Sequence, residues 1–135
     1  MRDMEQLTIF DYLDKPKDEL PLGYIHKDAE QYVGKEIPFR ELENYIGKKV
    51  LCEVPTMDRS WYKVVIMTSY HKDCDEVYDY REDDAKLIGK CDRVGFTDDN
   101  RQRKENCWVS EHFVRNGRYH NPEDKCSECF YELKE

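Results

Sequence analysis

The chain lacks the long apolar run that a membrane span requires. A transmembrane helix needs about 20 consecutive apolar residues, and no stretch of these 135 residues approaches that length. Residues 1–5 carry acids where a secretory signal peptide would have a basic region, and no long apolar run follows them. We therefore expect a cytoplasmic protein, whose thiols stay reduced. The six cysteines would then be free thiols or metal ligands rather than a disulfide framework.

The chain also lacks an excess of positive charge. The 22 Lys and Arg residues are outnumbered by 30 Asp and Glu residues, which gives a net charge of -8. A phosphate backbone repels such a chain, so we do not expect direct binding of nucleic acid. Aromatic residues nevertheless make up 13% of the sequence, and a disordered chain would be poor in them. The composition therefore predicts an acidic, folded protein.

Recognisable catalytic motifs are missing as well. The sequence has no Gly-rich phosphate loop and no Ser or Cys nucleophile in a known frame. Its acidic pairs do not have the spacing of a calcium loop. His112 lies in a predicted strand beside Trp108 and Phe113, where a histidine is more often a structural hydrogen-bonding group than a base. We expect no catalytic residues, and a binding protein rather than an enzyme.

Apolar residues follow a helical spacing before residue 47 and an alternating spacing after it. Ala29, Tyr32 and Val33 are spaced i, i+3, i+4, which predicts a short helix. Residues 38–46 predict a second helix that ends at Gly47. Strands are predicted at residues 50–54, 61–68, 76–80, 86–96, 107–114 and 129–133.

This pattern predicts an α+β fold. One or two short N-terminal helices would precede a small, curved antiparallel sheet or SH3-like barrel of about five strands. Residues 64–67 are apolar on both faces, so their strand should be central and covered on both sides. Two prolines and several charges in residues 15–23 predict an extended linker. We therefore divide the chain into an N-terminal segment, residues 1–23, and one domain, residues 24–135.

The first apolar cluster of the chain is Gln6-Leu7-Thr8-Ile9-Phe10. It resembles the linear motif by which bacterial proteins bind the DNA sliding clamp, which reads Gln-Leu, then Ser or Asp, then Leu-Phe. Thr at the third position and Ile at the fourth depart mildly from that motif. The resemblance implies that the three apolar side chains fill hydrophobic pockets and that the Gln6 amide fixes the register by hydrogen bonds.

An estimate of the docking energy follows from these five residues. Burial of each apolar side chain gains roughly 1.5–3 kcal/mol, and ordering each backbone unit costs about 1–2 kcal/mol. The two contributions nearly cancel before hydrogen bonds are counted, which predicts an affinity on the order of micromolar. The chain would then be a small adaptor on the clamp, as a replication or repair accessory factor or a phage-type inhibitor.

Two alternatives remain open at this point. Residues 1–13 could pack on their own domain as a terminal strand. The function would then lie in the sheet, as an acidic protein-binding module or a nucleic-acid mimic, with the N-terminal segment as part of the core.

A zinc site is the one cofactor site that the cysteines and histidines could form. His71 and Cys74 form an H-x₂-C pair, predicted on a loop between two strands, and Cys126 and Cys129 form a C-x₂-C pair. Together they would supply the four ligands of a structural zinc ion, with His120 as an alternative ligand. The alternative is that these cysteines are ordinary loop or core thiols.

Overall fold

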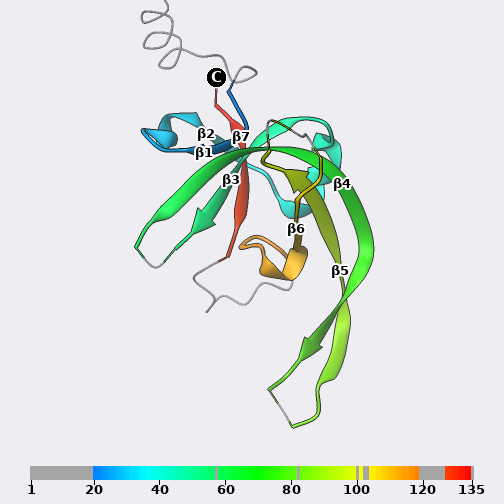
Figure 1. Ribbon diagram of the computed structural model, residues 1–135. Helices are drawn as coiled ribbons and strands as arrows, with labels where there is room; N and C mark the ends of the chain where they lie inside the picture. The colour runs from blue at the N-terminus through cyan, green and yellow to red at the C-terminus, as the bar shows by residue number, and fades with distance from the viewer. Residues whose placement is uncertain are drawn as a thin grey trace, which may run out of the picture.

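The fold is built from strands that form a single antiparallel sheet (Figure 1). The computed structural model describes residues 20–56, 58–81, 83–99, 101, 104–118 and 127–134. The strands are β1 (Gly23–Ile25), β2 (Val33–Glu36), β3 (Lys49–Pro55), β4 (Ser60–Asp79), β5 (Lys86–Thr97), β6 (Cys107–Ser110) and β7 (Cys129–Leu133). Three short 3₁₀ helices accompany them: η2 (Ala29–Tyr32), η3 (Phe39–Tyr45) and η4 (Glu111–Phe113). In these described residues, no helix has the length and apolar character that crossing a membrane would take.

Strand β4 is the centre of the sheet. The strand order is β2-β7-β3-β4-β5-β6, and β1 also pairs with β4. The first part of β4 has β3 on one edge and β1 on the other, because residues 62–64 pair with both. From Ile66 onward β5 takes the edge that β1 occupies earlier, so β1 and β5 follow one another along β4. Beyond β3, the second half of β4 continues as a two-stranded ribbon with β5 (Figure 1).

Both faces of the central strands are covered. Val65 belongs to the larger apolar cluster and Val64 to the smaller one, and both side chains are fully buried. The larger cluster contains Ile37, Phe39, Leu42, Val50, Cys52, Val65, Met67, Val94, Phe96, Val109, Val114 and Phe130. The smaller cluster contains Leu20, Leu22, Tyr32, Leu51, Val64 and Leu133. The prediction that residues 64–67 form a central strand covered on both sides is confirmed.

The prediction of an α+β fold is wrong. Strands account for 57% of the described residues and helices for 14%, and the sheet that they form has seven strands rather than about five. The segments predicted as N-terminal helices are 3₁₀ turns of four and seven residues. Their apolar spacing extends over too few residues to offset the unfavourable nucleation of an α-helix. A 3₁₀ turn also places residues i and i+3 on one side, so it buries Phe39 and Leu42 together.

Strand β2 is not among the predicted strands, because its first residue, Val33, was assigned to the predicted helix. Its second residue is Gly34. The structure shows why glycine is needed there. A Cβ atom at this position would lie 2.4 Å from the backbone carbonyl oxygen of Glu132 in β7. The glycine therefore permits the close approach through which β2 joins the edge of the sheet.

Candidate functional site

The outer part of the β4–β5 hairpin extends away from the rest of the sheet (Figure 1), and none of its described residues belongs to either apolar cluster. We call residues 76–90 the hairpin arm. Its rungs pair Glu76 with Lys90, Val77 with Gly89, Tyr78 with Leu87, and Asp79 with Lys86. Directly opposed residues of an antiparallel pair share a face, so the rungs alternate between the two faces of the arm.

One face of the arm is apolar and open to solvent. The exposed fractions of its large side chains are 38% for Tyr78, 73% for Tyr80, 48% for Leu87 and 49% for Ile88. Ile88 is the extra residue of a bulge between the Val77 and Tyr78 rungs. Tyr78, Tyr80 and Leu87 share one side of the ribbon by alternation, and Ile88 is exposed at the bulge beside Leu87. We call these four residues the apolar arm face. On the other face Val77 is buried, so the two faces of the arm differ in character.

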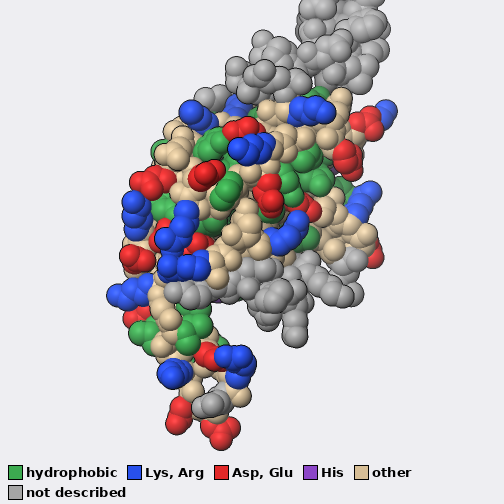
Figure 2. Space-filling model, turned by 180° about the vertical axis from the view of Figure 1, so that it is seen from behind, with side chains coloured by type: hydrophobic (Ala, Val, Ile, Leu, Met, Phe, Trp, Pro, Cys, Tyr) green, Lys and Arg blue, Asp and Glu red, His purple; other side chains and the backbone are tan. Residues whose placement is uncertain are grey.

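Charged side chains surround the apolar arm face (Figure 2). At the tip, the Arg81 guanidinium donates hydrogen bonds to both carboxylate oxygens of Asp79, at 2.9 Å and 2.6 Å, and these bonds lower the pKa of Asp79 to about 2. Asp83 and Asp84 are exposed in the turn that follows. At the base of the arm, Glu76 lies opposite Lys90.

The Tyr78 hydroxyl connects the apolar arm face to one of the surrounding charged residues. It donates a hydrogen bond to the Glu76 carboxylate, and this bond raises the pKa of Tyr78. The Tyr78 and Tyr80 rings lie 6.2 Å apart, centroid to centroid, in a tilted arrangement. Two adjacent aromatic rings held in this way form a contact surface with little rotamer entropy left to lose.

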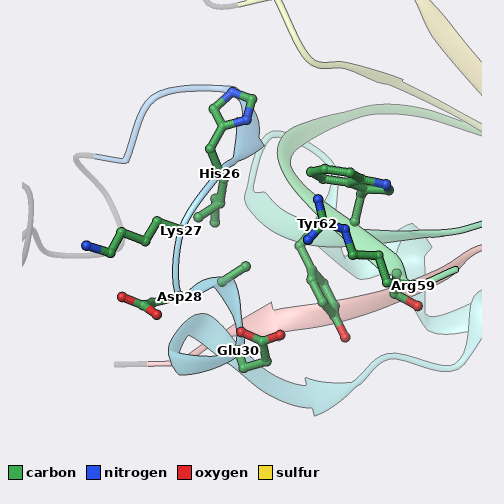
Figure 3. A pocket seen from close by; sticks show the side chains of 10 residues that line it. His26, Lys27, Asp28, Glu30, Arg59 and Tyr62 are labelled. Atoms are coloured by element: carbon green, nitrogen blue, oxygen red, sulfur yellow. The ribbon is translucent and has the colours of Figure 1, made fainter.

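A small polar pocket lies at the start of β4 (Figure 3). The Arg59 guanidinium stacks on the Trp61 ring at 4.0 Å. His26 and Asp28 of the β1–η2 connection and Glu30 of η2 also line the pocket. Its volume is about 130 Å³, below the roughly 300 Å³ at which small-molecule sites begin. Acids and bases are mixed along its wall, so the pocket has no preference for a ligand of one charge.

Cys91 and His112 form the one thiol–imidazole contact among the described residues, with 3.4 Å between Sγ and Nδ1. Burial raises the pKa of the Cys91 thiol and lowers the pKa of His112. Both shifts oppose the thiolate–imidazolium pair that a cysteine nucleophile uses. The Cys91 side chain is also fully buried. The contact therefore has the character of core packing and not of an activated nucleophile.

The residues proposed as zinc ligands are placed differently from the expected loop arrangement. His71 and Cys74 lie within β4, at a break in its register with β5, and not on a loop between two strands. Cys129 is buried in β7 and donates its S–H to Glu36 Oε1 at 2.6 Å. Burial and this hydrogen bond raise the Cys129 pKa to about 12, which opposes the thiolate that zinc requires. Among the described residues no three His, Cys, Asp or Glu side chains converge as metal ligands.

The other predicted site residues lie outside the described part of the chain. They are Gln6, Leu7, Thr8, Ile9 and Phe10 of the motif, together with His120 and Cys126. Clamp docking and the zinc site with Cys126 therefore stay predictions.

Sequence reasoning located the strands of the arm but missed the surface that they form. The available signal was the alternation of Tyr78 and Tyr80 with charged residues, followed across the turn by Leu87-Ile88. Comparisons with protein-family models, with curated proteins and with solved structures find no match for this chain. The functional argument therefore rests on the residues themselves.

Proposed function

We propose that this chain is a small cytoplasmic binding protein that works by contacting other proteins. The observation that carries the proposal is the apolar arm face, where four large apolar side chains are exposed together outside both apolar clusters. Contiguous exposed apolar surface is characteristic of interaction sites. Full burial of one such side chain gains about 1.5–3 kcal/mol, and tyrosine is enriched among the residues that dominate binding energies.

The charge of the arm favours a protein partner over a nucleic acid. Its described acids are Glu76, Asp79, Asp83 and Asp84, and its described bases are Arg81, Lys86 and Lys90. A surface on which nucleobases stack needs surrounding positive charge to bind the phosphates. The charged residues of the arm have no excess of positive charge. Mixed charge around an apolar centre is instead the usual anatomy of a protein–protein interface.

We further propose that residues 6–10 dock on a bacterial DNA sliding clamp. The support is the sequence resemblance of the motif and the way the chain enters the domain. Leu20 and Leu22 are buried in the smaller cluster, and Lys49 Nζ donates a hydrogen bond to the Leu20 carbonyl at 2.7 Å. Residues 11–19 separate the motif from this anchor, and an extended segment of that length spans at most about 30 Å. The predicted linker, residues 15–23, is therefore wrong at its end, because Leu20 and Leu22 are buried and Gly23 begins β1. The nine residues 11–19 still leave room for the domain and the clamp to lie side by side.

Calorimetric titration of a bacterial sliding clamp with the full chain tests both surfaces. We expect saturable binding that is lost in a Leu7→Ala/Phe10→Ala variant. A Tyr80→Ser/Leu87→Ser variant should retain that binding, because the arm is a separate surface. Absence of binding by the intact chain would refute clamp docking. Loss in the arm variant alone would show that the clamp is the partner of the arm and not of the motif.

A further inference from the structure

A hollow lies on the outer face of the sheet, where β4, β5 and β6 run side by side. Gly95 pairs with Ser69 on one side and with Trp108 on the other, so these three residues share one rung and one face. Val94 and Val109 form the next rung and point to the opposite face, into the larger apolar cluster. We call the hollow, which is lined by Ser69, His71, Arg93, Gly95, Glu105 and Trp108, the Gly95 hollow.

The Glu105 carboxylate lies over Gly95, in space that any other residue would fill. A Cβ atom on Gly95 would overlap this carboxylate. Its Oε1 atom accepts hydrogen bonds from Ser69 Oγ at 2.5 Å and from the Thr68 hydroxyl. Consecutive residues of a regular strand point to opposite faces, but a break in the β4–β5 register between Met67 and Ser69 lets both hydroxyls reach one oxygen. The two hydrogen bonds lower the pKa of Glu105, so its carboxylate is ionised at neutral pH.

Glu105 has no cationic partner among the residues that the structure describes. It belongs to none of the ion pairs found there. Both hydroxyl groups bond to Oε1, which leaves Oε2 to accept a further hydrogen bond. The Trp108 side chain is 65% exposed, and none of the cation–ring contacts within the described ranges includes it. An ionised carboxylate and an open indole ring thus line one hollow without a cation between them.

We propose that the Gly95 hollow binds one lysine or arginine side chain of a partner protein. The bound cation donates a hydrogen bond to Glu105 Oε2 and lies against the Trp108 ring, which combines a charge-assisted hydrogen bond with a cation–π contact. The hollow has a volume of about 200 Å³, less than the roughly 300 Å³ at which small-molecule sites begin, so it suits a single side chain. The net charge of -8 favours a basic partner.

This contact goes beyond the proposed function. The residues that line the Gly95 hollow are separate from the apolar arm face and from residues 6–10. A partner could therefore bind at the hollow whether or not the arm or the motif is occupied.

An anionic ligand is the alternative, because Arg93 and His71 also line the hollow. Arg93 is already paired, since the Asp75 carboxylate accepts hydrogen bonds from its Nε at 3.0 Å and from its Nη2. An anion in the hollow would also lie beside the ionised carboxylate of Glu105, and like charges repel. The described charges therefore favour a cation.

An NMR titration of the full, ¹⁵N-labelled chain with a blocked glycine–arginine–glycine tripeptide tests the proposal. The indole N–H signal of Trp108 should shift saturably, with a dissociation constant on the order of millimolar because one side chain supplies the contact. The same tripeptide with citrulline, which keeps the shape of arginine but has no charge, should bind at least about fivefold more weakly. Equal binding of the citrulline peptide, tighter binding of a glutamate peptide, or no saturable shift with the arginine peptide would each overturn the proposal.

Three variants locate the contact, and the same spectra report that each remains folded. Glu105→Gln should weaken binding by about fivefold or more, because the hydrogen bond loses its charged acceptor. Gly95→Ala keeps every charge but displaces the Glu105 carboxylate, so it should weaken binding as well. Glu30→Gln is the matched control, because it removes one negative charge from an exposed position on η2. Equal loss in this control would show attraction to net charge alone and overturn the site.

The arm variant separates this inference from the proposed function. Tyr80→Ser/Leu87→Ser should bind the arginine peptide as the wild type does, because neither residue lines the hollow. Loss of peptide binding in the arm variant would place the cation at the arm and overturn the assignment to the Gly95 hollow. Clamp binding is measured separately, so a chain that binds the clamp but not the peptide would overturn only the present inference.

Discussion

Replacement of Glu53 by glutamine should destabilise the fold by about 2–3 kcal/mol. Glu53 is 7% exposed on β3. Its carboxylate accepts hydrogen bonds from Ser60 Oγ at 2.5 Å, Tyr131 Oη at 2.8 Å and Arg115 Nη1 at 3.2 Å. Ser60 and Tyr131 lie on the strands to either side, β4 and β7, so one side chain links three strands and the segment after η4.

The magnitude follows from the number of acceptors that are lost. A hydrogen bond to a charged group contributes about 1.5–3 kcal/mol. A glutamine side chain has one acceptor oxygen and no charge. That oxygen can at best keep the two hydrogen bonds from Tyr131 and Arg115 in weakened form, and the bond that Ser60 donates to the second carboxylate oxygen is lost. Arg115 is half-exposed, so water takes over much of its lost interaction. The main loss therefore comes from the Ser60 hydrogen bond, which has no acceptor left, and from the Tyr131 hydrogen bond, which no longer has a charged acceptor.

The loss should also depend on pH. Burial raises the Glu53 pKa, but hydrogen bonds from Ser60, Arg115 and Tyr131 lower it by more, so the pKa lies below its ordinary value. A lowered folded-state pKa stabilises the fold fully above the ordinary carboxyl pKa of about 4.3, and the effect is lost as pH falls through the folded-state value. The difference in unfolding free energy between the wild type and Glu53→Gln should thus narrow in acid.

Urea unfolding, followed by circular dichroism from neutral pH into acid, measures this difference. Glu30→Gln serves as the control, because Glu30 is an exposed carboxylate on η2. Equal unfolding free energies of the wild type and Glu53→Gln at neutral pH would contradict this prediction. A difference that stays the same in acid would contradict it as well.

Two further outcomes are expected. Gly34→Ala should destabilise the fold by about 1–3 kcal/mol, because its Cβ would meet the Glu132 carbonyl oxygen at 2.4 Å; a urea midpoint equal to that of the wild type would contradict this. Cys74 is exposed, whereas Cys52 and Cys91 are buried, so peptide mass spectrometry should find Cys74 alkylated before either of these two in the native protein. Labelling of the two buried thiols at the same rate would show that the sheet opens more readily than its packing indicates.

The strands after residue 47 could be predicted from the sequence, but β1, β2 and the continuity of β4 could not. The segments 61–68 and 76–80 were predicted as separate strands, because the polar residues between them include Asp73 and break the alternation. In the structure they form one strand of 20 residues that passes through this irregularity as a bulge. A bulge and a turn share the same local residue types. Pairing with β5 decides between a bulge and a turn, and β5 begins more than ten residues after Asp73.

The hydrogen bonds of buried carboxylates could not be predicted from local sequence patterns either. In the sequence, Glu53 and Glu111 look like ordinary surface carboxylates. In the structure both are buried, and Glu111 accepts a hydrogen bond from Arg40 Nε at 3.0 Å. Arg40 and Glu111 are 71 residues apart in the chain. Tertiary pairing of this kind leaves no periodic signature, so the sequence predicted the apolar core much better than its polar contacts.

The arm shows why an exposed apolar surface carries more functional weight here than a pocket. A two-stranded ribbon is marginally stable in water without further packing, and the arm extends beyond both apolar clusters. Solubility alone would favour charged or small side chains on its open face, yet that face holds two tyrosines, a leucine and an isoleucine. Burial of this face would stabilise the ribbon and remove the apolar surface from water in the same step. The residues of the arm are therefore those expected of a segment that is completed by a protein partner.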